Sequence, residues 1–161
     1  MLHDRIPLKD IQKLTDRDYT VRGCTALLDA VGRTIEHISS IHKYARTEDV
    51  PAHTSFVIIT DGLENASREY DYRKVKALIE EKKKKGWEFL FIGANIDAAE
   101  EAAKIGISRD RSASYAADSV GTSVVFDAIA APLSQNRACG KITDVNWKNK
   151  IESDLRSRKK K

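Results

Sequence analysis

One short segment constrains the fold of this chain more than any other. Residues 55–60 form a run of apolar and β-branched side chains that ends in Asp61 and Gly62. A strand with no polar alternation is typical of a parallel sheet that is buried on both faces. In open α/β sheets, ligands bind at the carboxyl ends of such strands. The segment therefore predicts a parallel sheet with Asp61 at its carboxyl edge.

Helical and extended patterns alternate along the rest of the chain. Apolar residues at helical spacing follow Thr25, and a second helical segment stops at Gly86. Strands are expected at 88–93 and near 112–115, with a helix between them that Gly106 ends and a last helix after them. The expected helix caps are Ser67, then Asn95 or Asp97, then Asp118 or Ser119. This order predicts an α/β fold with a doubly wound, Rossmann-like, mostly parallel sheet flanked by helices.

Composition narrows the functional classes. The chain has 161 residues, enough for one domain, and a net charge of +4 that comes largely from Lys82–Lys85 and the C-terminal residues 156–161. No aromatic residues are interleaved with these clusters, so nucleic-acid binding is not expected. The apolar runs are too short for a membrane span, no leader is recognisable, and two cysteines make no disulfide framework. These features favour a cytoplasmic location.

A second motif precedes the strand at 55–60. It reads Gly-Cys-Thr-Ala-Leu-Leu-Asp-Ala over residues 23–30, a loop that enters a helix with the Thr25 hydroxyl at the turn. The patterns G-x-T-x-L-x-D-A and h-h-h-h-T-D-G-x-x-N, in this order, resemble the second and third metal-site motifs of von Willebrand factor A domains. The resemblance extends over about 21–137, and the segments 59–70 and 86–97 are similar to a cytoplasmic bacterial branch of stand-alone A domains.

The resemblance implies a metal-dependent binding site. In the family, oxygen ligands hold Mg²⁺, and a carboxylate from a partner protein completes the shell, in keeping with the preference of Mg²⁺ for hard oxygen donors. By position in the motifs, Thr25 and Asp61 are the expected metal ligands. Asp29 lies one turn into the helix and is expected to brace the loop instead of binding metal. Gly62 is expected to allow a sharp backbone turn.

The first motif of the family, D-x-S-x-S after a hydrophobic strand, has no counterpart before the other two. The string at 110–114 has this pattern but lies after both, and we interpret it as a coincidence. We therefore expect a sheet that lacks the first strands of the family and a Mg²⁺ site that is weak or absent. The expected division is an N-terminal edge segment at 1–20, a partial domain at 21–140 and a flexible basic tail at 141–161.

Two functions follow as hypotheses. The first is a non-enzymatic protein-binding module that engages an acidic residue of a partner, with self-association through the strand edge at 55–60. The alternative is a small α/β metal-dependent phosphohydrolase that uses Asp61. Against the alternative, the chain contains no G-x-x-x-x-G-K-[ST] phosphate loop and no evident acid–base pair. Simpler structural roles also stay open, with Thr25 as a helix N-cap and Asp61 as a turn residue.

Overall fold

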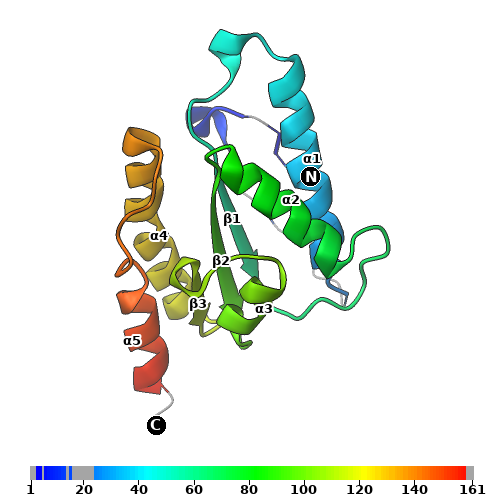
Figure 1. Cartoon of the computed structure of the whole chain (residues 1–161). Coiled ribbons are helices and arrows are strands. Elements are labelled where there is room, and N and C mark those ends of the chain that lie inside the picture. The colour runs from blue at the N-terminus through cyan, green and yellow to red at the C-terminus, as the bar shows by residue number, and fades with distance from the viewer. Residues whose placement is uncertain (1–2, 5, 14, 16–23, 159–161) are drawn as a thin grey trace.

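The sheet has three parallel strands with helices packed against it. A computed structural model describes residues 3–4, 6–13, 15 and 24–158. The strands β1 (Ser55–Thr60), β2 (Glu88–Ala94) and β3 (Ser112–Tyr115) lie in the order β1-β2-β3, and both neighbouring pairs are parallel (Figure 1). This α/β arrangement is the Rossmann-like layout that the sequence predicts.

Alternating side chains of the strands build a separate core on each face of the sheet. Phe89 and Phe91 of β2 pack with α1 (Leu27–Tyr44), α2 (Tyr72–Lys84) and α3 (Ala98–Lys104). Leu90 and Ile92 pack on the opposite face with α4 (Ser119–Cys139) and α5 (Asn149–Arg158). Burial on both faces explains why β2 has a continuous apolar sequence.

Two of the three expected caps are confirmed, one is wrong, and the alternative role of Thr25 as a cap is also wrong. Asp97 accepts hydrogen bonds from the first N–H groups of α3, and Asp118 does so for α4. The cap of α2 is Asp71, not Ser67, because the helix begins at Tyr72, about one turn later than a cap at Ser67 would place it. Thr25 is not the cap of α1 either, since the N-cap position is Ala26, which has no capping side chain.

Residues 141–158 are folded, in contrast to the flexible tail expected at 141–161. Ile142, Trp147 and Ile151 are buried in the core on the α4 side. The indole N–H of Trp147 donates to the carbonyl of Asp110 over 2.9 Å, and α5 continues to Arg158. The basic residues dominate the composition of this segment, but its few apolar residues decide its structure.

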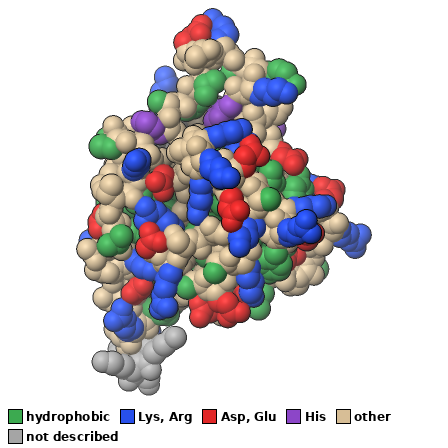
Figure 2. Space-filling view, viewed as in Figure 1, with side chains coloured by type: hydrophobic (Ala, Val, Ile, Leu, Met, Phe, Trp, Pro, Cys, Tyr) green, Lys and Arg blue, Asp and Glu red, His purple; other side chains and the backbone are tan. Residues whose placement is uncertain are grey.

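The N-terminal segment forms no strand among its described residues. Leu8–Asp10 is a short 3-10 helix, and Asp4 lies 3.2 Å from a ring nitrogen of His37 on α1. No helix within the described part of the chain is long and apolar enough to cross a membrane. On the face shown in Figure 2, Lys and Arg are interleaved with Asp and Glu, so that face carries no single basic patch.

Candidate functional site at the carboxyl edge of β1

The structure places Thr25 beside the end of β1. Asp61 directly follows the strand, and a Cβ atom at Gly62 would lie 3.3 Å from the Thr25 hydroxyl oxygen. The Thr60 hydroxyl donates to the Gly62 carbonyl over 2.9 Å and tightens the turn. The turn does not use the left-handed region at Gly62, so the value of glycine here is its small size next to Thr25.

A reciprocal pair of hydrogen bonds joins the loop after β1 to the loop before α1. The Thr25 N–H donates to the side-chain oxygen of Asn65 over 2.9 Å, and the Asn65 N–H donates to the Thr25 carbonyl over 3.1 Å. The Asn of the T-D-G-x-x-N pattern therefore has a structural role in fixing the segment that carries Thr25.

Glu64 caps α1 from a distance of 36 residues in the sequence. Its carboxylate accepts from the Leu28 N–H at 2.8 Å, and from the Ala66 N–H, the Ser67 N–H and the Ser67 hydroxyl within its own loop. Burial alone would raise the pKa of Glu64, but the N–H groups of Leu28 and Ser67 and the Ser67 hydroxyl outweigh it and lower the pKa. A helix start without a local cap thus gains one from the loop.

Asp29 braces the same loop, as the resemblance implied. Its carboxylate accepts from the backbone N–H groups of Arg68, Glu69 and Tyr70 at 2.9–3.0 Å. The hydrogen bond from Arg68 is the largest cause of the lowered pKa of Asp29. The Ser67 hydroxyl in turn accepts the Asp29 N–H at 3.0 Å. Both carboxylate oxygens of Asp29 are therefore engaged in holding the loop.

The outward side of the loop is left for interaction. The Asp61 side chain is exposed and makes no hydrogen bond among the described residues, and Leu63 is 54% exposed. The Asp61 carboxylate also acts on β3, because burial first and then this negative charge raise the pKa of Tyr115. Residues 61–65 thus form a fixed surface with one carboxylate and one apolar side chain directed outward.

The residues present do not fit a dedicated Mg²⁺ site. No group of three or more His, Cys, Asp or Glu that could hold a metal ion occurs within the described residues. Thr25 and Asp61 supply one neutral and one charged oxygen, which is fewer than Mg²⁺ normally takes from a protein and its substrate. Asp110 cannot add a ligand, since it precedes β3 and so lies at the amino edge of the parallel sheet.

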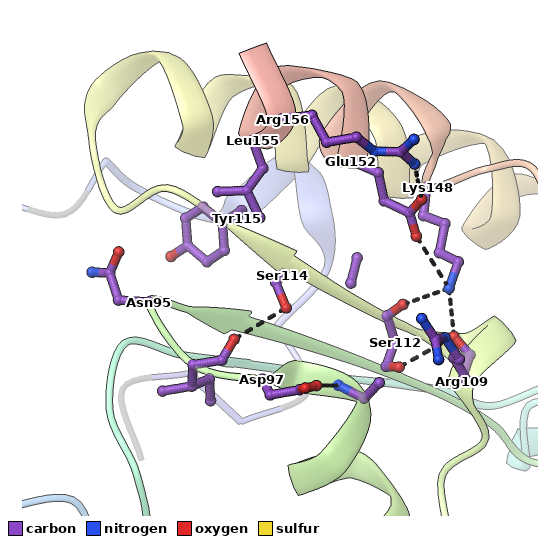
Figure 3. Close-up of a pocket in the computed structure, with 13 residues that line it drawn as sticks. Asn95, Asp97, Arg109, Ser112, Ser114, Tyr115, Lys148, Glu152, Leu155 and Arg156 are labelled. Atoms are coloured by element: carbon purple, nitrogen blue, oxygen red, sulfur yellow. Dashed lines mark hydrogen bonds and ion pairs between the residues drawn. The ribbon is translucent and has the colours of Figure 1, made fainter. Parts of the chain in front are cut away.

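A hollow of about 780 Å³ lies along the outer edge of β3 (Figure 3). Most polar groups there bind one another. The Lys148 ammonium donates to the carbonyls of Arg109 and Ser112 and lies 3.5 Å from Glu152, while the Ser114 hydroxyl donates to the Ile96 carbonyl. We assign this hollow no function.

Sequence reasoning found Thr25, Asp29 and Asp61 but missed Glu64. A capping contact across 36 residues leaves no local pattern, because ordinary cap signals are read within one turn of the helix start. Comparison with known proteins adds no assignment: no protein-family model, curated protein or solved structure matches the chain. The von Willebrand A resemblance therefore stays a prediction.

Proposed function

We propose that the chain is a non-enzymatic protein-binding module of von Willebrand A type on a doubly wound sheet, and that residues 61–65 form its recognition surface. One observation carries this proposal. The loop after β1 is held against α1 by Glu64, Asp29 and Asn65, while Asp61 and Leu63 point outward without partners among the described residues.

Such a loop suits binding because its order is already established before a partner arrives. A preorganised surface loses less conformational entropy on association than a mobile one. The combination of an apolar side chain with a charged one at its rim is also common in protein interfaces.

The hydrogen bonds and lowered pKa of the carboxylates near the site support binding over catalysis. Asp29 and Glu64 are the acidic groups nearest in sequence to Thr25 and Asp61, and both are engaged by backbone N–H groups that lower their pKa. A general acid at neutral pH needs a raised pKa and a free position toward the substrate.

Metal is a minor contributor in this proposal. With two protein oxygens, Mg²⁺ and Mn²⁺ should bind no more tightly than about millimolar. An acidic residue of the partner would bind through the metal ion. A metal titration therefore tests both the metal site and the expected acidic partner residue.

Paramagnetic broadening of amide signals by Mn²⁺ measures this affinity. We expect weak broadening around 61–65 that Asp61→Ala reduces and Asp97→Ala, a change at another strand end, leaves unaltered. Micromolar affinity that Asp61→Ala abolishes would mean that further residues complete the shell.

The binding role itself is tested by a photo-crosslinking side chain placed at Leu63, with Val145 as the matched control because it is also 54% exposed. We expect a discrete cross-linked protein from cell extract at position 63 but not at 145, and its loss with Asp61→Lys. Phosphate release from a phosphomonoester with Mg²⁺, abolished by Asp61→Ala, would overturn the proposal in favour of the hydrolase.

A further inference from the structure

The two outer edges of the sheet differ in their protection. At β3, the Lys148 ammonium donates to the Ser112 carbonyl over 3.0 Å, and α5 packs beside the strand. At β1, no strand pairs with the outer edge among the described residues. The segment 55–60 contains no Lys, no Pro and no bulge, which are the usual devices that keep an edge strand from pairing.

The hydrogen bonding of β1 to β2 fixes which groups point outward. The Thr54 carbonyl accepts the Glu88 N–H over 3.0 Å, and Ser55 is the register partner of Glu88. Because successive residues of a strand point to opposite sides, the even-numbered residues of β1 bond to β2. The N–H and C=O groups of Ser55, Val57 and Ile59 therefore face the open edge.

Apolar side chains flank this edge on both faces of the sheet. On the α4 face, Ile59 of β1 is 41% exposed. On the α1 face, a pocket of about 870 Å³ lies beside β1 and is lined by Ile38, Ile41 and Phe56, among others. An added strand would cover both.

We infer that the chain forms a twofold-symmetric dimer in which β1 pairs antiparallel with β1 of a second copy, with Val57 at the axis. This inference does not rest on the proposed function, but the two share Asp61, which lies at the end of the paired strand and in the proposed recognition surface. Only one symmetric register aligns all three outward residues: Ser55 opposite Ile59 of the second copy, and Val57 opposite Val57. It forms about six interstrand hydrogen bonds and joins the two sheets into one.

Complementary hydrogen-bonding groups at the two ends of β1 select a second copy as the occupant. The same register sets His53, just before the strand, opposite Asp61 of the other copy, just after it. His53 lies against Gly140 at the end of α4, Asp61 is exposed directly after β1, and neither side chain makes a hydrogen bond among the described residues. Each imidazole can donate an N–H to a carboxylate, and the symmetry makes this contact twice.

Sedimentation equilibrium of the full chain in EDTA tests the dimer. We expect a dimer whose dissociation constant rises at least about tenfold with Ile59→Lys, which adds an edge charge to an exposed position. Val145→Lys, an equally exposed apolar site elsewhere, is the matched control and should leave the dimer unchanged. His53→Asp should weaken the dimer through carboxylate repulsion, and the double change His53→Asp with Asp61→His should restore it.

The register is tested by disulfide trapping with copper phenanthroline in a Cys24→Ser, Cys139→Ser background. Val57→Cys should give a covalent dimer, because like residues meet at the axis with Cα atoms about 5.5 Å apart. Ile59→Cys should not, since its two copies lie about 13 Å apart in this register. A monomer in EDTA, a dimer indifferent to Ile59→Lys, or equal trapping at both positions would overturn the inference, as would an added h-h-h-h-D-x-S-x-S peptide that binds β1 of a monomer.

Discussion

At the scale of single residues, the candidate site consists of inward carboxylates that hold a loop and one outward carboxylate. Glu64 forms four hydrogen bonds, three of them with backbone N–H groups. Asp61 forms none with the described residues. The two acidic residues are three positions apart in the sequence, yet Glu64 holds the loop and Asp61 is exposed, as the proposed recognition role requires.

Glu64→Ala should lower the free energy of unfolding at neutral pH by about 1–3 kcal/mol, because it leaves N–H groups of the helix start and the loop without their acceptor. Urea denaturation measures the change. Glu48→Ala is the control, since Glu48 is exposed and lies 3.7 Å from Arg46, and it should cost less than about 0.5 kcal/mol.

The pH dependence of unfolding, compared between wild type and Glu64→Ala, also tests the role of the Glu64 carboxylate. The lowered pKa means that the carboxylate stabilises the fold above its ordinary pKa of 4.5 and that this stabilisation is lost as the pH falls through the folded-state value. The difference between wild type and Glu64→Ala should therefore shrink in acid. A difference that stays constant down to pH 3 would contradict the hydrogen-bonded carboxylate.

At the scale of elements, the strands were predictable and the helix starts were less so. The apolar runs at 55–60 and 88–93 are of strand length and are bounded by Asp61 and Gly86. Both are strands in the structure, and β2 extends one residue beyond the predicted end at 93. The start of α2 was misplaced because Ser67, a good cap by type, is used to bind Asp29 and Glu64. The sequence shows which residues are able to cap a helix, but not which hydrogen-bond partner each of them has in the folded structure.

The C-terminal element shows the same limit. Ile142, Trp147 and Ile151 are spaced too widely to form a periodic apolar pattern. Their burial follows from their contacts with the core on the α4 face of the sheet, which the local sequence does not show. Candidate residues that come from motifs, such as Thr25 and Asp61, could be found from the sequence, whereas Glu64 required the tertiary structure.

Trp147→Ala should destabilise the chain by about 3–5 kcal/mol, because it removes a core side chain and leaves the Asp110 carbonyl without its donor. Val145→Ala, two residues away and exposed, should change the stability little. Thermal unfolding followed by circular dichroism compares the two. Equal, small effects would indicate that residues 141–158 do not contribute to the core.

At the scale of the whole molecule, the sheet is closed on one side and open on the other. Lys148 and α5 protect β3, and nothing comparable among the described residues protects β1. The proposed recognition surface at 61–65 begins where this open edge ends. Pairing of two copies would set two such surfaces in one assembly, with Leu63 exposed in each and Asp61 next to His53 of the other copy, and would increase the avidity for a partner that contacts both.

Residue-resolved amide hydrogen exchange tests the open edge most directly. The amides of Phe56 and Ile58 point to β2 and should be protected at every protein concentration. The amides of Val57 and Ile59 should be protected at high concentration and exchange much faster on dilution, as the dimer dissociates. Uniform protection along β1 that is independent of concentration would contradict a free edge that a second copy completes.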